Sequence, residues 1–186
     1  MLLAGGKSRR FGGINKSLIE IDGVTIAERS VSLLKPLFHE IILAGWPAGS
    51  PVPPGVRPVS DNYHGVGPLA GIEAALRASV TPYLFVFGGD MPWLSEEIIT
   101  RQVNDFVNYP ADILVPCPGE LQEPLHSLWS CNLHEQLKRY LESGGSPAVI
   151  DFFKLVRTRL LRLEPEPGIL KAFTNINAPG DIPETS

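Results

Sequence analysis

A stretch rich in glycine and positive charge begins near the start of the chain and is well suited to bind an anion. It runs from Gly5 to Lys16, directly after four apolar residues, and holds four glycines and four of the chain's 16 lysine and arginine residues. Glycines let the backbone approach a ligand closely, and exposed N–H groups in such a loop bind anions. Lysine and arginine supply the charge that a chain of phosphates needs. The pattern predicts a phosphate-binding loop, and a flexible glycine turn with solvated cations is the alternative.

This loop follows neither of two common phosphate-binding patterns. Gly6-Lys7-Ser8 matches the end of a P-loop, but the glycine required five positions before Gly6 is replaced by Met1. No G-x-G-x-x-G sequence follows the first apolar residues, so the dinucleotide-binding fingerprint is missing as well. The loop therefore belongs to a third kind of phosphate site.

Asp90 is the residue best suited to hold a metal ion. It follows Gly88 and Gly89 at the end of an apolar run over residues 83–87, and the two glycines leave space around its carboxylate. Magnesium typically takes one or two carboxylates together with phosphate oxygens and waters. A carboxylate that caps the turn before Pro92 is the alternative.

Two other polar segments are candidates for binding a substrate. Asp61 precedes a segment in which Gly65 and Gly67 indicate close backbone approach, although a helix that starts at Pro68 would also explain them. Asn175 and Asn177 are spaced to face the same side of an extended segment, and turn or helix-cap roles are their alternative. The four histidines show no metal-binding spacing, and the absence of a G-x-S-x-G elbow argues against an α/β-hydrolase.

Helical patterns that alternate with apolar runs must position these residues. Helices are predicted over residues 26–37, 68–79, 95–108, 132–142 and 146–154, and strands over residues 40–44, 56–59, 83–87, 113–115 and 157–163. This alternation predicts an α/β fold, a three-layer α/β/α sandwich around a mostly parallel sheet, in one domain that spans residues 1–186. Ligands in such folds bind beyond the carboxyl ends of the strands, so Gly5 and Asp90 should line one crevice.

The bulk composition narrows the class of protein. A formal net charge of −4 and a pI near 5.6 argue against non-specific binding to nucleic acid. No apolar run reaches the roughly 20 residues of a membrane span, and no secretory pattern opens the sequence. Cys117 and Cys131 lack the spacing of a zinc or redox motif, which indicates reduced thiols. We therefore expect a cytoplasmic protein that binds neither nucleic acid nor membrane.

Four motifs occur in a fixed order between residues 3 and 181. They read LAGGKSRRFGGINK, SDNYHGVGPLAG, GGDMPWLS and NINAPGD. Together they resemble the signatures of the molybdenum cofactor guanylyltransferase family, which belongs to molybdopterin-guanine dinucleotide biosynthesis. The related cytidylyltransferases of molybdopterin usually read LAAG in the first motif, so Gly5-Gly6 favours the guanine-specific branch. The resemblance implies a Rossmann-like nucleotidyltransferase fold of the glycosyltransferase-A type.

The resemblance also implies a reaction. GTP donates GMP to the terminal phosphate of molybdenum-bound molybdopterin, with Mg²⁺ as cofactor, and pyrophosphate leaves. GTP and molybdenum–molybdopterin are thus the expected substrates, and cofactor-inserting chaperones and molybdoenzymes are the implied partners. The alternatives are another nucleotidyltransferase of the same fold, acting on molybdopterin with CTP or on a sugar 1-phosphate, and a non-catalytic GTP-binding protein.

Residue roles follow from the same resemblance. Lys16, Arg10 and Asp90 are the implied catalytic residues, and Asp90 is also the implied metal ligand. The residues implied to bind the nucleotide are Leu3, Ala4, Gly5, Gly6, Lys16, Asp61, Gly67 and Asp90. Asn175 and Asn177 match positions linked with the pterin substrate, and residues 123–128 resemble a family segment near the same pocket.

Three positions depart from the family pattern. Asn15 stands where the family commonly has aspartate before the loop lysine, Ala44 where it often has asparagine, and Gly89 where it has the cysteine of a CDMP-like segment. None of the three removes Lys16 or Asp90, so activity is still expected.

Overall fold

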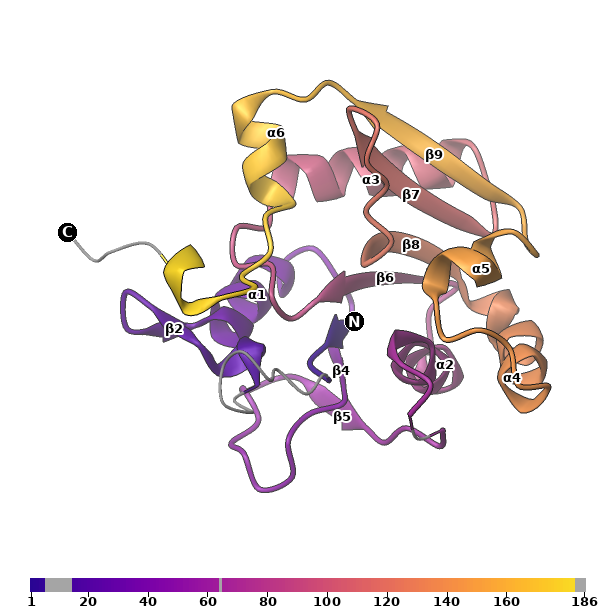
Figure 1. The fold of residues 1–186 in the computed structure, drawn as a ribbon, viewed down its shortest axis with the longest axis horizontal. Helices are drawn as coiled ribbons and strands as arrows, with labels where there is room; N and C mark the ends of the chain where they lie inside the picture. Colours follow the sequence, from indigo (N-terminus) through magenta and orange to yellow (C-terminus); the bar gives the residue numbers. More distant parts are fainter. Residues whose placement is uncertain (6–14, 64, 183–186) are drawn as a thin grey trace.

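A seven-stranded sheet forms the centre of the computed structural model, which describes residues 1–5, 15–63 and 65–182 (Figure 1). The spatial order is β5 (Arg57–Val59), β4 (Ile42–Ala44), β1 (Leu2–Leu3), β6 (Tyr83–Gly88), β8 (His126–Ser130), β7 (Ile113–Pro118) and β9 (Thr158–Leu163). Strand β8 runs antiparallel to β6 and β7, and the other neighbours pair in parallel. The prediction of a mostly parallel sheet is therefore confirmed.

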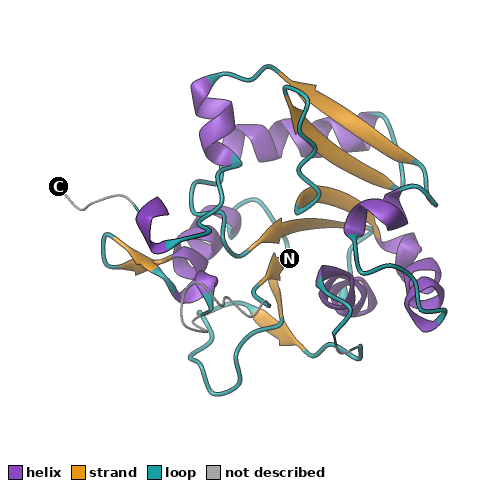
Figure 2. Cartoon of the chain, in the orientation of Figure 1, coloured by secondary structure: helices purple, strands orange, loops and turns teal. Residues whose placement is uncertain are grey.

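Helices cover both faces of this sheet and complete the predicted three-layer sandwich (Figure 2). One face carries α1 (Ile26–Leu34), α3 (Glu96–Asn108) and α6 (Pro167–Ala172), and the other carries α2 (Pro68–Ala78), α4 (His134–Glu142) and α5 (Val149–Phe153). A separate two-stranded hairpin, β2 (Glu20–Ile21) and β3 (Val24–Thr25), precedes α1. Within the described ranges, no helix is both long enough and apolar enough to cross a membrane.

Strand β6 shows how the sequence builds two cores from one sheet. Phe85 and Phe87 pack in the core beneath α1 and α3, whereas Leu84 and Val86 pack in the core beneath α2 and α4. Successive side chains of a strand point to opposite faces, so a strand buried on both sides is apolar throughout. The continuous apolar run at residues 83–87 predicted this arrangement.

Several helices have other bounds than predicted, and prolines account for two of the differences. Helix α1 ends at Leu34 rather than at residue 37, because Pro36 lacks the N–H that would continue the helix. Helix α5 begins at Val149 rather than at residue 146, because Pro147 disfavours a helical backbone at the residue before it. A short 3₁₀ turn, η3 (Cys131–Leu133), occupies the start of the helix predicted from residue 132.

The start of α3 agrees with its prediction. Ser95 caps the helix, since its side chain accepts a hydrogen bond from the Ile98 N–H at 3.4 Å.

Strand β8 and helix α6 were not predicted. The sequence of β8, HSLWS, has no clear alternation of apolar and polar residues, yet all five residues are buried. Two of its polar side chains are satisfied locally, because Ser127 Oγ donates to the Pro124 carbonyl at 2.7 Å and accepts from Trp129 Nε1 at 2.8 Å. Only its place between β6 and β7 makes this segment a core strand.

A third, smaller core joins the hairpin to the C-terminal segment. Ile176 is fully buried against Ile19, Ile21 and Ile26. Figure 1 accordingly shows the 3₁₀ turn η4 (Pro179–Asp181) beside β2 and α1. This packing brings the last of the four motifs to the same side of the molecule as the first.

His126 is a buried titratable group in the middle of the sheet. Its ring lies between those of Phe85 and Phe173, at centroid distances of 5.0 Å and 4.7 Å. Burial lowers the pKa of His126 from its usual 6.5 to about 4. The folded protein therefore holds this imidazole neutral at a pH where the unfolded chain would protonate it.

The free energy of unfolding should consequently fall by about 3 kcal/mol as the pH drops from about 6.5 to about 4, because only the unfolded state takes up this proton readily. Above pH 6.5 the contribution of His126 should not change with pH. Urea unfolding across this range measures the loss, and His126→Leu should remove that part of the pH dependence. A His126→Leu variant with unchanged acid sensitivity would contradict the assignment.

Candidate functional site

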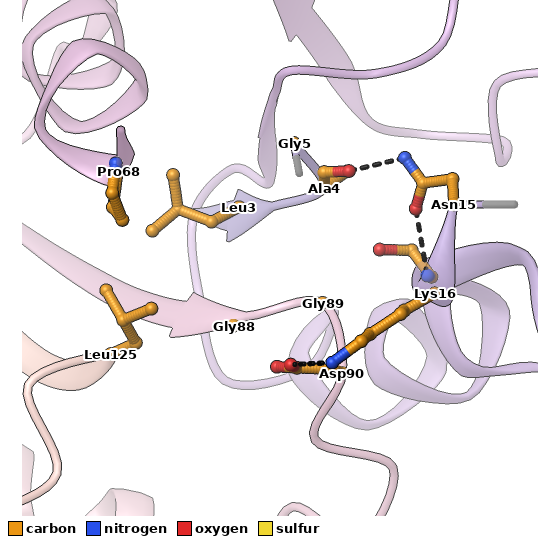
Figure 3. Close-up of a pocket in the computed structure, with 11 residues that line it drawn as sticks. Leu3, Ala4, Gly5, Asn15, Lys16, Pro68, Gly88, Gly89, Asp90 and Leu125 are labelled. Atoms are coloured by element: carbon orange, nitrogen blue, oxygen red, sulfur yellow. Dashed lines mark hydrogen bonds and ion pairs between the residues drawn. The ribbon is translucent and has the colours of Figure 1, made fainter. Parts of the chain in front are cut away.

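A cavity of about 250 Å³ lies at the carboxyl ends of β1 and β6 (Figure 3). Its walls come from four of the segments that the sequence singled out. The lining residues are Leu3, Ala4, Gly5, Asn15, Lys16, Ser17, Pro68, Gly88, Gly89, Asp90 and Leu125. The structure therefore brings Gly5 and Asp90 into one cavity, at the edge of the sheet where ligands bind in parallel α/β folds.

Lys16 and Asp90 form an ion pair inside this cavity. The Lys16 Nζ lies 3.0 Å from Asp90 Oδ2, and it also donates to Asn177 Oδ1 at 2.9 Å. Lys16 begins the 3₁₀ turn η2 (Lys16–Leu18), whereas Asp90 follows β6. Figure 3 shows the lysine side chain extending across the end of β6 to the carboxylate. The loop motif, the GGD motif and the C-terminal motif thus meet at a single ammonium group.

Asn15 closes the base of the loop that precedes Lys16. Its Oδ1 accepts from the Ser17 N–H at 2.9 Å and caps η2, and its Nδ2 donates to the Ala4 carbonyl. An aspartate at this position has no N–H to donate to a carbonyl. The departure from the family pattern at residue 15 therefore has a structural role, because the amide ties η2 to the end of β1.

A second cavity, of about 370 Å³, continues the first along β4 and the start of α2. It shares Leu3, Gly5 and Pro68 with the first cavity and is completed by Ala44, Gly45, Asp61, Tyr63, Gly65, Gly67, Ala70 and Gly71. Helix α2 begins at Pro68, so the partial positive charge of its N-terminus faces both cavities. Such a wall suits the phosphates and the sugar of a nucleotide.

Gly45 is a residue of this second cavity that the sequence did not single out. Its φ is +70°, and a Cβ built on it would lie 2.7 Å from the Gly5 Cα. The backbones of β4 and the glycine loop approach each other so closely that only glycine fits here. The one signal in the sequence is that a glycine directly follows a predicted strand.

A third cavity, also of about 370 Å³, lies on the other side of Asp90. Its walls include Asp90, Leu125, Glu123 and Asn175. Burial, and secondly the nearby Asp90 carboxylate, raise the pKa of Glu123 above its usual value. The first cavity therefore adjoins both of the others, and Asp90 lies in the wall between the first and the third.

The predicted site residues divide among these cavities. Leu3, Ala4, Gly5, Lys16 and Asp90 line the first, Asp61 and Gly67 line the second, and Asn175 lines the third. Asn177 reaches Lys16. Gly6 and Arg10 lie outside the described residues.

Most main-chain N–H and C=O groups at the end of β1 already form hydrogen bonds within the protein. The Leu3 carbonyl accepts from the Gly89 N–H at 2.9 Å, and the Ala4 N–H donates to the Ala44 carbonyl at 2.9 Å. With the Ala4 carbonyl bonded to Asn15, these groups hold the sheet and the loop together. The Leu3 carbonyl, the Ala4 N–H and the Ala4 carbonyl are therefore already occupied by hydrogen bonds within the fold.

Asp90 is a suitable ligand for a hard divalent cation. Its carboxylate is partly exposed at the cavity wall, beside the cationic residue that would hold a phosphate. Among the residues that the structure describes, no group of three or more His, Cys, Asp or Glu side chains is placed to hold a metal by itself. Magnesium is usually bound through one or two carboxylates with substrate phosphates and waters, which fits this single carboxylate.

Gly89, at the position where the resemblance implies a cysteine, is packed closely against Ser17 and β1. A Cβ at residue 89 would overlap Ser17 Oγ and lie 2.9 Å from the Leu3 carbonyl oxygen. The buried Ser17 hydroxyl therefore fills the space that a larger residue at position 89 would need.

Gly89→Ala should accordingly destabilise the protein by about 1–3 kcal/mol, the usual cost of overpacking a core. Ser17→Gly in the same chain should recover part of this loss, because it removes the overlapping hydroxyl. Urea unfolding of both single variants and the double variant measures this coupling. Strictly additive losses would rule out a direct clash between the two positions.

Comparison with known proteins identifies relatives along most of the chain. The sequence model of the family described as "MobA-like NTP transferase domain" matches residues 1–159. A protein of Pelotomaculum thermopropionicum named "Probable molybdenum cofactor guanylyltransferase" is 32% identical over 185 residues, which cover 98% of this chain and 88% of the relative. The molybdenum cofactor guanylyltransferase of Shewanella putrefaciens is 30% identical over 156 residues, which cover 83% of this chain and 80% of the relative.

Solved structures show the same fold. Molybdopterin-guanine dinucleotide biosynthesis protein A from Archaeoglobus fulgidus superposes with a TM-score of 0.79 at 23% identity, over 97% of this chain and 93% of that chain. The 2-C-methyl-D-erythritol 4-phosphate cytidylyltransferase of Thermus thermophilus superposes with a TM-score of 0.69 at 17% identity, again over 97% and 93%. The predicted nucleotidyltransferase-type α/β sandwich is therefore confirmed.

Proposed function

The chain belongs to the MobA-like NTP transferase domain family, and from this premise we propose that it transfers GMP from GTP to molybdenum-bound molybdopterin. Family membership confirms the resemblance that the four ordered motifs predicted, and it makes the chain a nucleotidyltransferase. The products of the proposed reaction are molybdopterin guanine dinucleotide and pyrophosphate.

The observation that carries this proposal is the meeting of Lys16 and Asp90 in one cavity. The two residues are 74 positions apart in the sequence, yet their side chains lie 3.0 Å apart at the ends of neighbouring segments. A cation and a metal-binding carboxylate placed together are what a triphosphate needs, because phosphoryl and nucleotidyl transfers depend mainly on positioning and on charge neutralisation.

The proposed chemistry is an in-line displacement at the α-phosphorus of GTP. A phosphate oxygen of the acceptor attacks this atom, and the bond to the β-phosphate breaks, so that pyrophosphate leaves. The acceptor phosphate is already ionised at neutral pH, so no side chain has to act as a general base. The task of Lys16 is to hold the phosphates and to balance the charge that shifts onto the leaving group.

Asp90 is the residue that we propose to hold the metal. Nucleotidyltransferases typically use a divalent metal ion, and a neighbour of the same fold from Mycobacterium tuberculosis, 18% identical with a TM-score of 0.66, was solved as a complex with manganese. We propose Mg²⁺ for this chain, because its preference for one carboxylate plus phosphate oxygens matches the donor set around Asp90. The ion would neutralise the triphosphate when bound.

We assign the remaining site residues by cavity. Gly5, Asp61 and Gly67 would contact the nucleotide along the second cavity, together with Leu3 and the N-terminus of α2. Ala4 would contribute indirectly, because its carbonyl accepts a hydrogen bond from Asn15 and so helps to position the neighbouring Lys16.

Two loop residues and the acceptor side complete this assignment. Gly6 and Arg10, from the same loop, remain proposed ligands of the phosphates, and Arg10 of the leaving pyrophosphate. Asn175 would face the acceptor from the third cavity. Cofactor-inserting chaperones and molybdoenzymes are the proposed recipients of the product, and the thiols of Cys117 and Cys131 suit a cytoplasmic location.

Product analysis tests the proposal. The protein, incubated with GTP, Mg²⁺ and molybdenum–molybdopterin, should form the guanine dinucleotide and release one pyrophosphate for each product molecule. A reaction without the acceptor is the matched control and should release no pyrophosphate. The same assay with CTP, ATP and UTP separates the alternatives, because a preference for CTP would assign the chain to the cytidylyltransferases. Binding of GTP without pyrophosphate release would indicate a non-catalytic nucleotide-binding protein.

A further inference from the structure

Lys16 has two hydrogen-bond acceptors among the described residues, and they differ in charge. Its Nζ donates to the Asp90 carboxylate at 3.0 Å and to the neutral Asn177 carbonyl oxygen at 2.9 Å. Under the proposed function, Asp90 also holds a divalent cation, and two cations that share one carboxylate repel each other. The Asn177 oxygen has no such competitor, so it is the acceptor that can keep Lys16 in place while the site is in use.

The backbone around Asn177 is fixed from both sides. The preceding residue, Ile176, is fully buried in the small core, and its N–H donates to the Asp90 carbonyl at 2.9 Å. The Asn177 N–H itself donates to Asp181 Oδ2 at 2.7 Å. The side chain of Asn177 therefore extends from an anchored segment, and its position relative to η2 and β6 is set by packing rather than by Lys16.

The other asparagine of the motif has different surroundings. Asn175 lies in the wall of the third cavity, together with Glu123 and Leu125. Two residues further on, Asn177 contacts the lysine of the first cavity. The NIN motif thus carries one amide on each side of Asp90, although both asparagines match positions that the family resemblance links with the pterin substrate.

We propose that Asn177 is a positioning residue that acts on the nucleotide side of the site by holding Lys16. This inference rests on the proposed function, because it requires a nucleoside triphosphate and a divalent cation in the cavity. A hydrogen bond to a charged group is stronger than one between neutral groups, so the loss of the Asn177 oxygen should affect the placement of Lys16 measurably.

Equilibrium binding of GTP with Mg²⁺, in the absence of the acceptor, tests the inference in a double-mutant cycle. Asn177→Ala should weaken GTP binding about five- to tenfold. In a chain that already carries Lys16→Met, Asn177→Ala should change binding by less than about twofold, because the lysine that it positions is gone. Asn175→Ala is the matched control and should leave GTP binding within about twofold in both backgrounds.

Three outcomes would overturn the inference. Equal weakening by Asn177→Ala in both backgrounds would mean that Asn177 acts on the nucleotide or on the fold directly. Unchanged GTP binding in the Asn177→Ala variant would mean that it does not position Lys16. An effect of the same size after Mg²⁺ is removed by a chelator would contradict the competition for Asp90. Failure of the proposed function is distinguishable, since the parent protein would then fail to bind GTP or to release pyrophosphate with the acceptor.

Discussion

Asp90→Asn should lower the rate of GMP transfer by about 10³-fold. The substitution keeps the shape of the side chain but removes the charge that holds Lys16 and that we assign to the metal ion. A bound cation contributes several kcal/mol of charge stabilisation to a transition state, and about 4 kcal/mol corresponds to about 10³ in rate. Pyrophosphate release, followed at several Mg²⁺ concentrations, should show both the lower rate and a higher Mg²⁺ requirement.

The loss should come from the chemistry and not from unfolding. The Lys16 and Asp90 side chains are 22% and 27% exposed, so water still reaches both groups and limits the stability that their ion pair contributes. Urea unfolding of the Asp90→Asn variant measures the remaining contribution. Glu164→Gln, the same change of acid to amide at an exposed position, is the matched control and should keep full activity. An Asp90→Asn variant that retains activity within tenfold of the parent would remove Asp90 from the metal site.

Lys16→Met should lower the rate of the same reaction by about 10²–10³, the scale of losing one electrostatic stabiliser in an active site. Methionine retains the length of the side chain but cannot donate to phosphate oxygens or to Asp90. The effect should appear in kcat as well as in the KM for GTP, because the lysine is expected to balance charge that moves to the leaving pyrophosphate.

Lys138→Met on the opposite side of the α/β sandwich, in α4, provides a matched control for the loss of a lysine. It should leave both kinetic constants unchanged. Lys16→Arg should recover part of the rate, since it restores the charge but not the shape of the ammonium group. Near-normal turnover by Lys16→Met would exclude the residue from the mechanism.

The arrangement of the strands allowed much of the site to be predicted from sequence. Gly5 and Asp90 each follow an apolar strand, and parallel strands end at the same edge of a sheet. The structure accordingly has β1 and β6 as neighbours, with Leu3 paired to Gly88. Two motifs that are far apart in the sequence could therefore be assigned to one cavity from hydrophobic periodicity and the rule that ligands bind beyond the carboxyl ends of parallel strands.

Other parts of the site depend on tertiary packing that no local pattern reveals. The contact between Lys16 and Asn177 exists because Ile176 is buried among the isoleucines of the hairpin. The close approach of Gly45 to Gly5 depends on which strand lies next to β1. Strand β8 places polar residues such as Ser127 inside the buried sheet, where Ser127 bonds to Pro124 and to Trp129, so its sequence shows no clear strand pattern. In each case, the structure of the segment depends on the part of the protein that packs against it and not on its own sequence pattern.

The position of β1 has a consequence for the order in which the protein is made and folds. Residue 2 pairs with residue 43 on one side and with residue 87 on the other, so β1 is synthesised before both of the strands that flank it in the finished sheet. Contacts over such sequence separations form slowly, because the intervening chain must lose its freedom first. Helix α1 and the β2–β3 hairpin can form early from local contacts. The end of β1 gains its second neighbouring strand only after residue 88 has been synthesised, and Lys16 gains its contact with Asn177 later still, so the proposed nucleotide site is completed late in translation.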